Sequence, residues 1–374
     1  MGFYLIMLAV FAVNIYLSRG LAHRLGIKAL WIKIIYYPLY FAMVLSYFLS
    51  RLFMTVSAND RTDTFTALAG HALPSTLYAV LIICMYKLLR YGYVKISGKT
   101  WPVKAQTGFY VLLVALLTIN VYGYYNAVHP VRQSYEVPVG TNLPVERLKI
   151  VMVSDLHLGK NIDLQFVYDF IGKVNNEQAD LIVLIGDIID SDLESVKRKQ
   201  LLSPLAHMKA KNGVYAVLGN HEYISKQPHT VINMLRSVQV KVLVDQTAFI
   251  PNLNVGLIGL NDIGHRRADN KDTATIALLA GQLPNNSIKI MLDHQPGRIL
   301  NAAENKISLT LSGHTHRGQY YPLNYVTQQI FLNDWGLKKF DDTYSVVSCG
   351  YGNWGANMRV GSRTELVVLN LVRQ

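Results

Sequence analysis

The sequence predicts an α/β domain preceded by an apolar region of membrane-spanning helices, and three observations lead to this fold class. Residues 1–126 are dominated by long apolar stretches. From Leu148 onward, short β-branched runs alternate with amphipathic segments, which is typical of α/β domains. Small polar clusters directly follow several of those runs. We therefore expect a transmembrane region over residues 1–126 and a second domain over residues 127–374.

The composition excludes several classes of protein. Of the 374 residues, 51% are hydrophobic and 16% are charged, so the chain is too apolar to be disordered and lacks the composition of a collagen or a disulfide-stapled protein. Its two cysteines, Cys84 and Cys349, lie far apart, the first of them in an apolar run. We expect no disulfide between them.

The apolar region contains four stretches that are near the roughly 17 to 25 residues a helix needs to cross a bilayer. They are residues 2–18, 34–53, 65–86 and 107–125. The basic residues of the first stretch follow the apolar run and do not precede it. We therefore interpret that stretch as a retained helix and not as a cleaved signal peptide, which gives a region of about four transmembrane helices.

The net charge of +12 is unevenly distributed along the chain. Residues 1–146 carry +8 and residues 147–374 carry +4. Nine basic residues lie in the loops between spans one and two and between spans three and four, against three on the other side. The positive-inside rule then predicts a multi-pass protein of a bacterial inner or plasma membrane whose second domain is extracytoplasmic. The modest charge of that domain argues against nucleic-acid binding.

Short β-branched runs in the second domain predict its strands, and amphipathic segments predict its helices. Strands are expected near residues 135–137 and at 149–153, 181–185, 214–218, 240–244, 255–260, 288–292, 308–311, 344–348 and 365–371. Helices are expected at residues 164–176, 194–208, 230–238 and 273–283. About 230 residues are enough for one large hydrophobic core.

Polar clusters follow five of these strands at their carboxyl ends. They are Asp155 with His157, Asp187, Asn220 with His221 and Glu222, His294, and His314 with His316. In open α/β sheets, ligand sites assemble at the carboxyl ends of strands. Carboxylate, imidazole and amide groups without thiolates are ligands that Mn, Fe or Zn accept, so the clusters predict a metal site.

The spacing within the clusters supports that prediction. Asp155 and His157 are two residues apart, so on an extended segment both side chains would point to the same face and could hold one ion. His314 and His316 repeat this spacing. Taken singly, each residue also has an ordinary structural explanation, such as a helix N-cap for Asp187 or packing for His294. The joint occurrence of all five clusters favours metal binding.

The clusters stand in an order that resembles the calcineurin-like metallophosphoesterases, whose pattern is D-x-H, G-D, G-N-H-[DE], H and G-H-x-H. All five blocks are intact, and the resemblance extends from about residue 135 to the C-terminus. It implies a four-layer α/β/β/α sandwich with two mixed sheets face to face. The S-D-L-H-L-G and S-G-H-T-H-x-G-Q blocks resemble the bacterial membrane-anchored branch, although Arg317 stands where that branch often has Gly.

The resemblance also implies roles for the individual residues. Two divalent ions, Mn, Zn or Fe, would be bound by the motif residues. The first would be held by Asp155, His157 and His316, the second by Asn220, His294 and His314, with Asp187 bridging both. His221 would contact the scissile phosphate or protonate the leaving oxygen, and Glu222 would orient His221. Two such ions can activate a bridging hydroxide and stabilise both the attacking and the leaving oxygen.

These residues predict a membrane-anchored two-metal phosphoesterase that hydrolyses phosphodiesters or phosphomonoesters by a metal-bridging hydroxide. Two alternatives stay open: a lipid-precursor pyrophosphatase or phospholipid-headgroup hydrolase at the membrane surface, and a metal-binding sensor domain on a membrane bundle. The substrate would be a phosphate ester, with lipid-linked and nucleotide-linked esters both among the candidates, and the sequence leaves the oligomeric state open. A further set of residues either forms a substrate rim or packs in the interior: Tyr320, Tyr321, Trp335, Tyr351, Trp354 and Arg359.

Overall fold

The computed structural model describes residues 70–266 and 272–373, together with short pieces between residues 14 and 42. The chain forms two compact units, residues 1–125 with 355–358 and residues 126–354 with 359–374. We call the second of these the α/β unit. The first and second predicted spans fall mostly outside the described residues.

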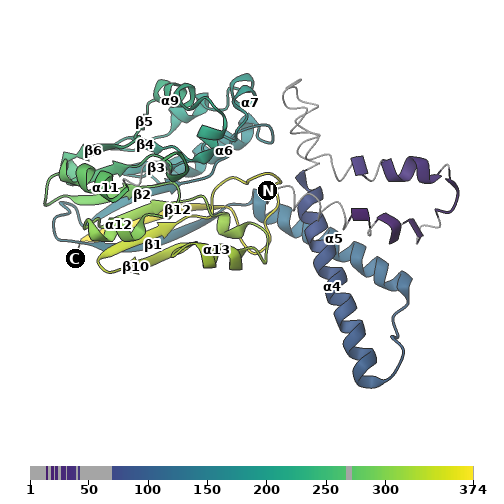
Figure 1. Ribbon diagram of the computed structural model, residues 1–374. Coiled ribbons are helices and arrows are strands. Elements are labelled where there is room, and N and C mark those ends of the chain that lie inside the picture. Colours follow the sequence, from purple (N-terminus) through teal and green to yellow (C-terminus); the bar gives the residue numbers. More distant parts are fainter. Residues whose placement is uncertain are drawn as a thin grey trace. The chain divides into compact units, whose positions relative to one another are not determined.

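Two mixed six-stranded sheets form the centre of the α/β unit (Figure 1). In spatial order, the first sheet contains β1 (Val131–Val139), β12 (Glu365–Arg373), β2 (Arg147–Val153), β3 (Leu181–Ile185), β4 (Val214–Val217) and β5 (Val240–Val242). The second contains β10 (Gly336–Phe340), β11 (Thr343–Val347), β9 (Leu309–Ser312), β8 (Ile288–Leu292), β7 (Val255–Gly259) and β6 (Gln246–Ile250). Strands β2 to β5 are parallel to one another, as are β7, β8, β9 and β11.

Helices cover the outer faces of both sheets. They are α6 (Leu164–Asn176), α7 (Leu193–Arg198), α9 (Pro228–Ser237), α11 (Asp272–Gly281) and α12 (Ile299–Glu304). The other short helices of the unit are α8 (Asn220–Ile224), α10 (Ile263–Arg266) and α13 (Asn324–Ile330). Three short 3-10 turns are η1 (Ser203–His207), η2 (Pro251–Leu253) and η3 (His316–Gly318). Helix α6 begins where it does because the Asp163 carboxylate accepts a hydrogen bond from the Phe166 N–H at 2.9 Å, which satisfies a free donor of the first turn.

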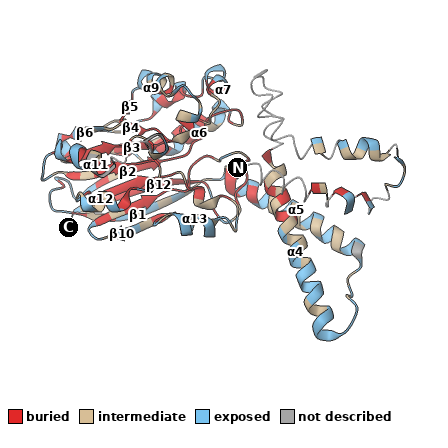
Figure 2. Cartoon of the chain, viewed as in Figure 1, coloured by how far each residue is buried: buried red, intermediate tan, exposed pale blue. Residues whose placement is uncertain are grey.

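Side chains alternate between the two faces of each strand, and the buried apolar ones form three separate clusters. On β2, Ile150 and Met152 lie between the two sheets, whereas Val151 and Val153 pack against helices such as α6. A third cluster joins β7 and β8 to α11 and α12. Figure 2 shows the buried residues concentrated on the strands, with exposed residues on the outer surfaces of the helices. The predicted α/β class is confirmed, and the three clusters give it four layers.

Two of the described helices, α4 (Ala72–Ser97) and α5 (Ala105–Val128), are long and apolar enough to cross a membrane. They correspond to the third and fourth predicted spans, although α4 begins and ends later than the sequence indicated. The expected count of four membrane helices is not confirmed, because the structure describes only these two candidates.

The strands of the α/β unit lie close to their predicted positions, with two additions. Strands β6 and β10 were not predicted, and each pairs antiparallel at the edge of the second sheet. The expected helix over residues 194–208 is instead α7 followed by η1. A Pro at the beginning of η1 fits this break, because proline cannot donate the hydrogen bond of a helix interior.

Candidate metal centre

The predicted ligands follow the carboxyl ends of β2, β3, β4, β8 and β9, on loops or, for Asn220 and His316, at the first residue of α8 and of η3. The parallel strands bring these loops together although the residues are up to 161 positions apart. Asp155 and His157 do not lie on an extended segment, as the sequence argument assumed. Their φ angles are +54° and +48°, and those of Asp187, His314 and His316 are also positive. Left-handed backbone at non-glycine residues is strained and is typical of functional sites.

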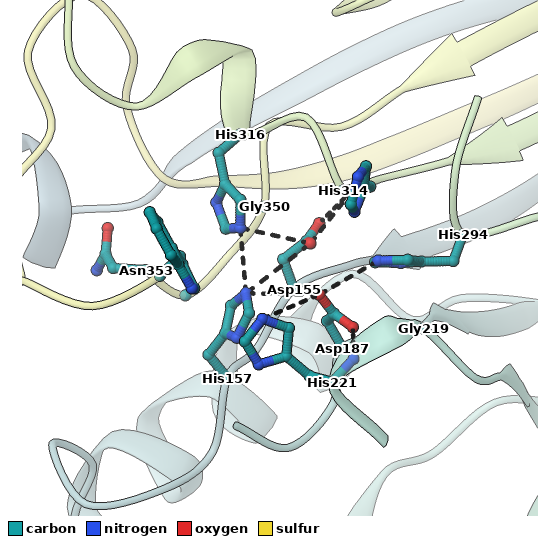
Figure 3. Close-up of polar contacts among 12 residues, drawn as sticks. Asp155, His157, Asp187, Gly219, His221, His294, His314, His316, Gly350 and Asn353 are labelled. Atoms are coloured by element: carbon teal, nitrogen blue, oxygen red, sulfur yellow. Dashed lines mark hydrogen bonds and ion pairs between the residues drawn. The ribbon is translucent and has the colours of Figure 1, made fainter. Parts of the chain in front are cut away.

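One group of ligand atoms comes from the loops after β2 and β9. The Nε2 atoms of His157 and His316 lie 3.1 Å apart, and His316 Nε2 lies 3.5 Å from Asp155 Oδ1. All three side chains are buried, and their ligand atoms lie within 4.8 Å of one another. Figure 3 shows the three side chains pointing toward one another. They could hold one cation.

A second group consists of Asp187, His294 and His314, whose ligand atoms also lie within 4.8 Å of one another. His294 Nε2 lies 3.2 Å from Asp187 Oδ2, and Nδ1 of the same ring donates to the Ile185 carbonyl at 2.8 Å. That hydrogen bond fixes the ring and leaves Nε2 directed at the site, the usual arrangement behind a metal-binding histidine. His157 Nε2 lies 3.9 Å from Asp187 Oδ2, so Asp187 stands between the two groups.

Several buried polar atoms in the site have no hydrogen-bond partner within the described residues. The clearest is Asn220 Oδ1, while His294 Nε2 has only the Asp187 carboxylate at 3.2 Å beside it, without hydrogen-bond geometry. Unpaired buried polar atoms are costly and need an explanation. A divalent cation supplies one, because imidazole nitrogen and amide oxygen both donate a lone pair to it. The donor set therefore fits divalent metal ions.

The protonation states of two ligands favour the same conclusion. Burial lowers the pKa of His157 and of His314 to about 4 in each case. Both rings are therefore neutral near pH 7, and neutral imidazole is the form that binds a metal. For Asp187, burial raises the pKa, but the neighbouring histidines, His294 foremost, outweigh burial and hold it below its ordinary value. The carboxylate is thus ionised.

Glycine is required at two positions where backbone crowds the carboxylates. A Cβ on Gly219 would overlap Asp187 Oδ1 and lie 2.6 Å from the Asp187 nitrogen. A Cβ on Gly313 would lie 2.5 Å from Asp155 Oδ2. The G-N-H and G-H-T-H blocks therefore begin with glycine for a steric reason.

His221 projects from the first turn of α8 beside the ligand groups. Its Nε2 lies 4.0 Å from Asp187 Oδ2, while its Nδ1 lies 2.9 Å from Asp190 Oδ1. Burial opposes protonation of His221, but the hydrogen bond to Asp190 and the charge of Asp187 outweigh burial and raise its pKa. The ring thus holds a proton on Nδ1 against Asp190 and turns Nε2 toward the site.

The carboxylate of Glu222 has different contacts from those expected of it. Its oxygens accept hydrogen bonds from the backbone N–H groups of Gly219 at 2.7 Å and of Asp187 and Ile189 at 3.0 Å each. Burial and then the charge of Asp187 raise the pKa of Glu222 to about 7. The side chain in direct contact with the His221 ring is Asp190, whereas Glu222 holds the backbone on which His221 stands, so any influence of Glu222 on His221 is indirect. Asp190 lies three residues after Asp187 of the G-D block, and this proximity is the only sign of it in the sequence.

The set of aromatic and basic residues from the sequence analysis divides into two kinds. Arg359 is fully buried; its Nη2 lies 3.0 Å from His316 Nδ1 and donates to the Gly352 carbonyl at 2.7 Å. Tyr351 is also buried and packs against Phe166 and Phe170. Both residues lie in the interior of the α/β unit, and neither forms a rim around the metal centre.

The remaining members of that set lie nearer the surface. Tyr321 and Trp354 are exposed. The guanidinium of Arg317, the residue that departs from the membrane-anchored branch, lies over the Trp335 ring at 4.0 Å from its centroid. The position where that branch often has Gly thus carries a cation that is stacked on an aromatic ring.

Known proteins resemble this chain over most of its length. The family model for the calcineurin-like phosphoesterase matches residues 148–318. An uncharacterized metallophosphoesterase of Campylobacter jejuni is 30% identical over 97% of this chain and 98% of its own length. One from Helicobacter pylori strain J99 is 31% identical over 63% of each chain. A Bos taurus protein named as a transmembrane protein with metallophosphoesterase domain is 28% identical over 89% of this chain and 79% of its own.

Proposed function

The chain belongs to the calcineurin-like metallophosphoesterase family and is a metal-dependent phosphoesterase, and from this premise we propose that it is a membrane-anchored hydrolase that uses two divalent ions. The observation that carries the proposal is the convergence of the two ligand groups, with Asp187 between them. We assign the first ion to Asp155, His157 and His316. We assign the second to Asn220, His294 and His314, with Asp187 shared.

When bound, the ions polarise the phosphoryl group and lower the pKa of a nearby water. The protein's own residues then complete the site. His221 Nε2 faces the same space as the ligands and is placed to donate a proton to the leaving oxygen. Asp190 holds the Nδ1 proton, which fixes the orientation of the ring as it gives up the proton on Nε2. The His221 and Asp190 pair favours catalysis over a purely metal-sensing role, because metal binding alone would not require it.

Membrane anchoring is supported by α4 and α5 and by the relative named as a transmembrane protein. The distribution of basic residues supports an extracytoplasmic α/β unit. The substrate is then a phosphate ester at the outer surface of the membrane. A reporter enzyme fused to the C-terminus and assayed in intact cells tests this orientation, and a cytoplasmic reporter signal would contradict it.

The enzymatic proposal is tested with detergent-solubilised full-length protein that has been stripped of metal. We expect hydrolysis of bis-p-nitrophenyl phosphate or p-nitrophenyl phosphate to return on addition of Mn, Zn or Fe. Asp187→Asn should lose both turnover and metal content, whereas Asp341→Asn, at an exposed aspartate, should keep both. Full two-metal occupancy in Asp187→Asn would contradict the bridging assignment.

A further inference from the structure

An exposed apolar segment lies on the α/β unit next to the metal centre. Residues 321–332 contain no charged side chain, and α13 within them has no buried residue. Six large apolar side chains in the segment are exposed: Tyr321, Leu323, Tyr325, Val326, Ile330 and Leu332. We call these six the α13 patch. Apolar surface concentrated in this way on one short segment marks an interaction site.

The α13 patch is attached rigidly to the metal ligands. The Phe331 ring, at the end of α13, has its centroid 6.2 Å from that of His314. Asp334 joins the two elements, since its carboxylate accepts from Thr327 on α13 at 2.9 Å and its carbonyl accepts from Thr315 at 2.7 Å. Thr315 lies between the ligands His314 and His316. A molecule bound at the patch is therefore held beside the metal centre.

The last residues of α5, from Asn126 onward, belong to the α/β unit and form hydrogen bonds within it. Asn126 donates to the Arg359 carbonyl at 3.2 Å and accepts at its own carbonyl from the Thr364 N–H at 3.2 Å. The Ala127 carbonyl accepts from Asn353 at 3.2 Å. Helix α5 ends at Val128 and β1 begins at Val131, so only two residues separate them. The chain therefore enters the α/β unit directly from an apolar helix, with no long linker in the sequence between α5 and β1.

The flank of the α13 patch carries basic residues. Lys338 Nζ donates to the Leu332 carbonyl at 3.1 Å, and Lys338 and Lys339 are both exposed on β10. Asp341 and Asp342 lie beyond them, at the turn between β10 and β11. An apolar segment bordered by lysines is typical of surfaces that insert between lipid headgroups.

We propose that the α13 patch inserts into the bilayer surface and presents the headgroup of an amphiphilic phosphate ester to the metal centre. This inference rests on the proposed function and narrows its substrate class to membrane lipids or lipid-linked esters. The bilayer is favoured over a second copy of the chain because Lys338 borders the patch and because only two residues separate the apolar helix α5 from β1 of this unit.

Lipid contact is tested first, without reference to activity. Full-length protein carrying Cys84→Ser and Ile330→Cys is labelled with an environment-sensitive fluorophore and reconstituted into phosphatidylcholine and phosphatidylglycerol vesicles. The matched control carries the label at Leu278→Cys, an exposed apolar position on α11. We expect a blue shift and quenching by brominated lipids at position 330 only. A label at 330 that is as water-exposed as at 278 overturns the proposal. A label that is protected but unquenched also overturns it, in favour of a protein partner.

The second test compares the rates of hydrolysis of two esters that both release p-nitrophenolate. The rate on a diacylglycerol p-nitrophenyl phosphodiester in vesicles is divided by the rate on soluble bis-p-nitrophenyl phosphate. Changing Tyr325 and Ile330 together to Gln should lower this ratio about tenfold, whereas Leu278→Gln with Leu300→Gln should leave it unchanged. An unchanged ratio in the first pair overturns the proposal. If the unaltered protein hydrolyses neither ester, the proposed function fails, while the label still reports whether the patch meets lipid.

Discussion

At the scale of single residues, the contact between His221 and Asp190 determines how the imidazole can act. His221 Nδ1 lies 2.9 Å from Asp190 Oδ1, and its Nε2 faces the ligand groups. A histidine held in this way can donate only from Nε2 into the site. Its pKa is raised despite burial, because Asp190 and Asp187 stabilise the protonated ring. These contacts suit a general acid.

We predict that His221→Ala lowers kcat by about 10²–10⁴-fold on esters with poor leaving groups. The loss should be much smaller on p-nitrophenyl esters, because nitrophenolate leaves without being protonated. Asp190→Asn should show the same dependence on the leaving group with a smaller loss, since it removes the orientation and charge of His221 but keeps the ring. Steady-state kinetics on a paired alkyl and aryl ester measure both effects.

One kinetic result would contradict the assignment of His221 as the general acid. Equal losses on the alkyl and the aryl ester would mean that His221 binds the phosphate and does not protonate the leaving oxygen. Asp341→Asn serves as the matched control, because Asp341 is exposed.

At the scale of secondary structure elements, Glu222 fixes the start of α8 and the loop after β3. Its buried carboxylate accepts three backbone N–H groups, from Gly219, Asp187 and Ile189. Helix α8 has only five residues, so its own hydrogen bonds stabilise it little. The position of Asn220 and His221 therefore depends on this side chain.

Glu222→Gln should destabilise the protein by about 1–3 kcal/mol, because the amide nitrogen that replaces one oxygen cannot accept and leaves a buried N–H unpaired. For a domain of this size that corresponds to a fall in Tm of about 2–4 °C per kcal/mol. Thermal unfolding in detergent measures it, with Glu146→Gln at an exposed position as the control. A normal Tm with lost turnover would instead show that Glu222 acts in the chemistry.

At the scale of the whole molecule, the metal centre joins loops from both sheets. Asp155, His157 and Asp187 come from the first sheet, and His294, His314 and His316 come from the second. A cation held by these residues would link the two sheets at their carboxyl edges. Among the described residues, the buried and ionised Asp187 is stabilised by neighbouring histidines, His294 foremost.

Metal removal should lower the stability of the α/β unit as well as its activity. Ligand at one hundred times its Kd stabilises the folded state by about 2.7 kcal/mol, so a chelator should lower Tm by several degrees and divalent metal should restore it. For Asp187→Asn, the Tm measured with chelator and the Tm measured with divalent metal should differ by less. Identical melting curves before and after removal, with loss of metal verified by elemental analysis, would contradict a stabilising role for the ions.

Much of the site was predictable because its residues lie in short motifs that directly follow strands. The sequence predicted the strands, since buried parallel strands are continuous β-branched runs such as residues 181–185. It did not predict β6 or β10, which pair antiparallel at sheet edges and carry a weaker apolar pattern. Asp190 was overlooked because it carries no motif of its own and acquires its role only by facing His221.

The sequence by itself determined the α/β class, the family and the seven proposed metal ligands. Apolar periodicity and short motifs involve residues that are close together in the chain, so they can be recognised without the structure. Only the tertiary structure decided that Asp190 orients His221, that Glu222 binds backbone, that Arg359 supports His316 from the interior, and that α13 exposes its apolar side chains. Each of these depends on residues brought together from distant parts of the chain. Such contacts are set by how the sheets and loops pack, which no local pattern specifies.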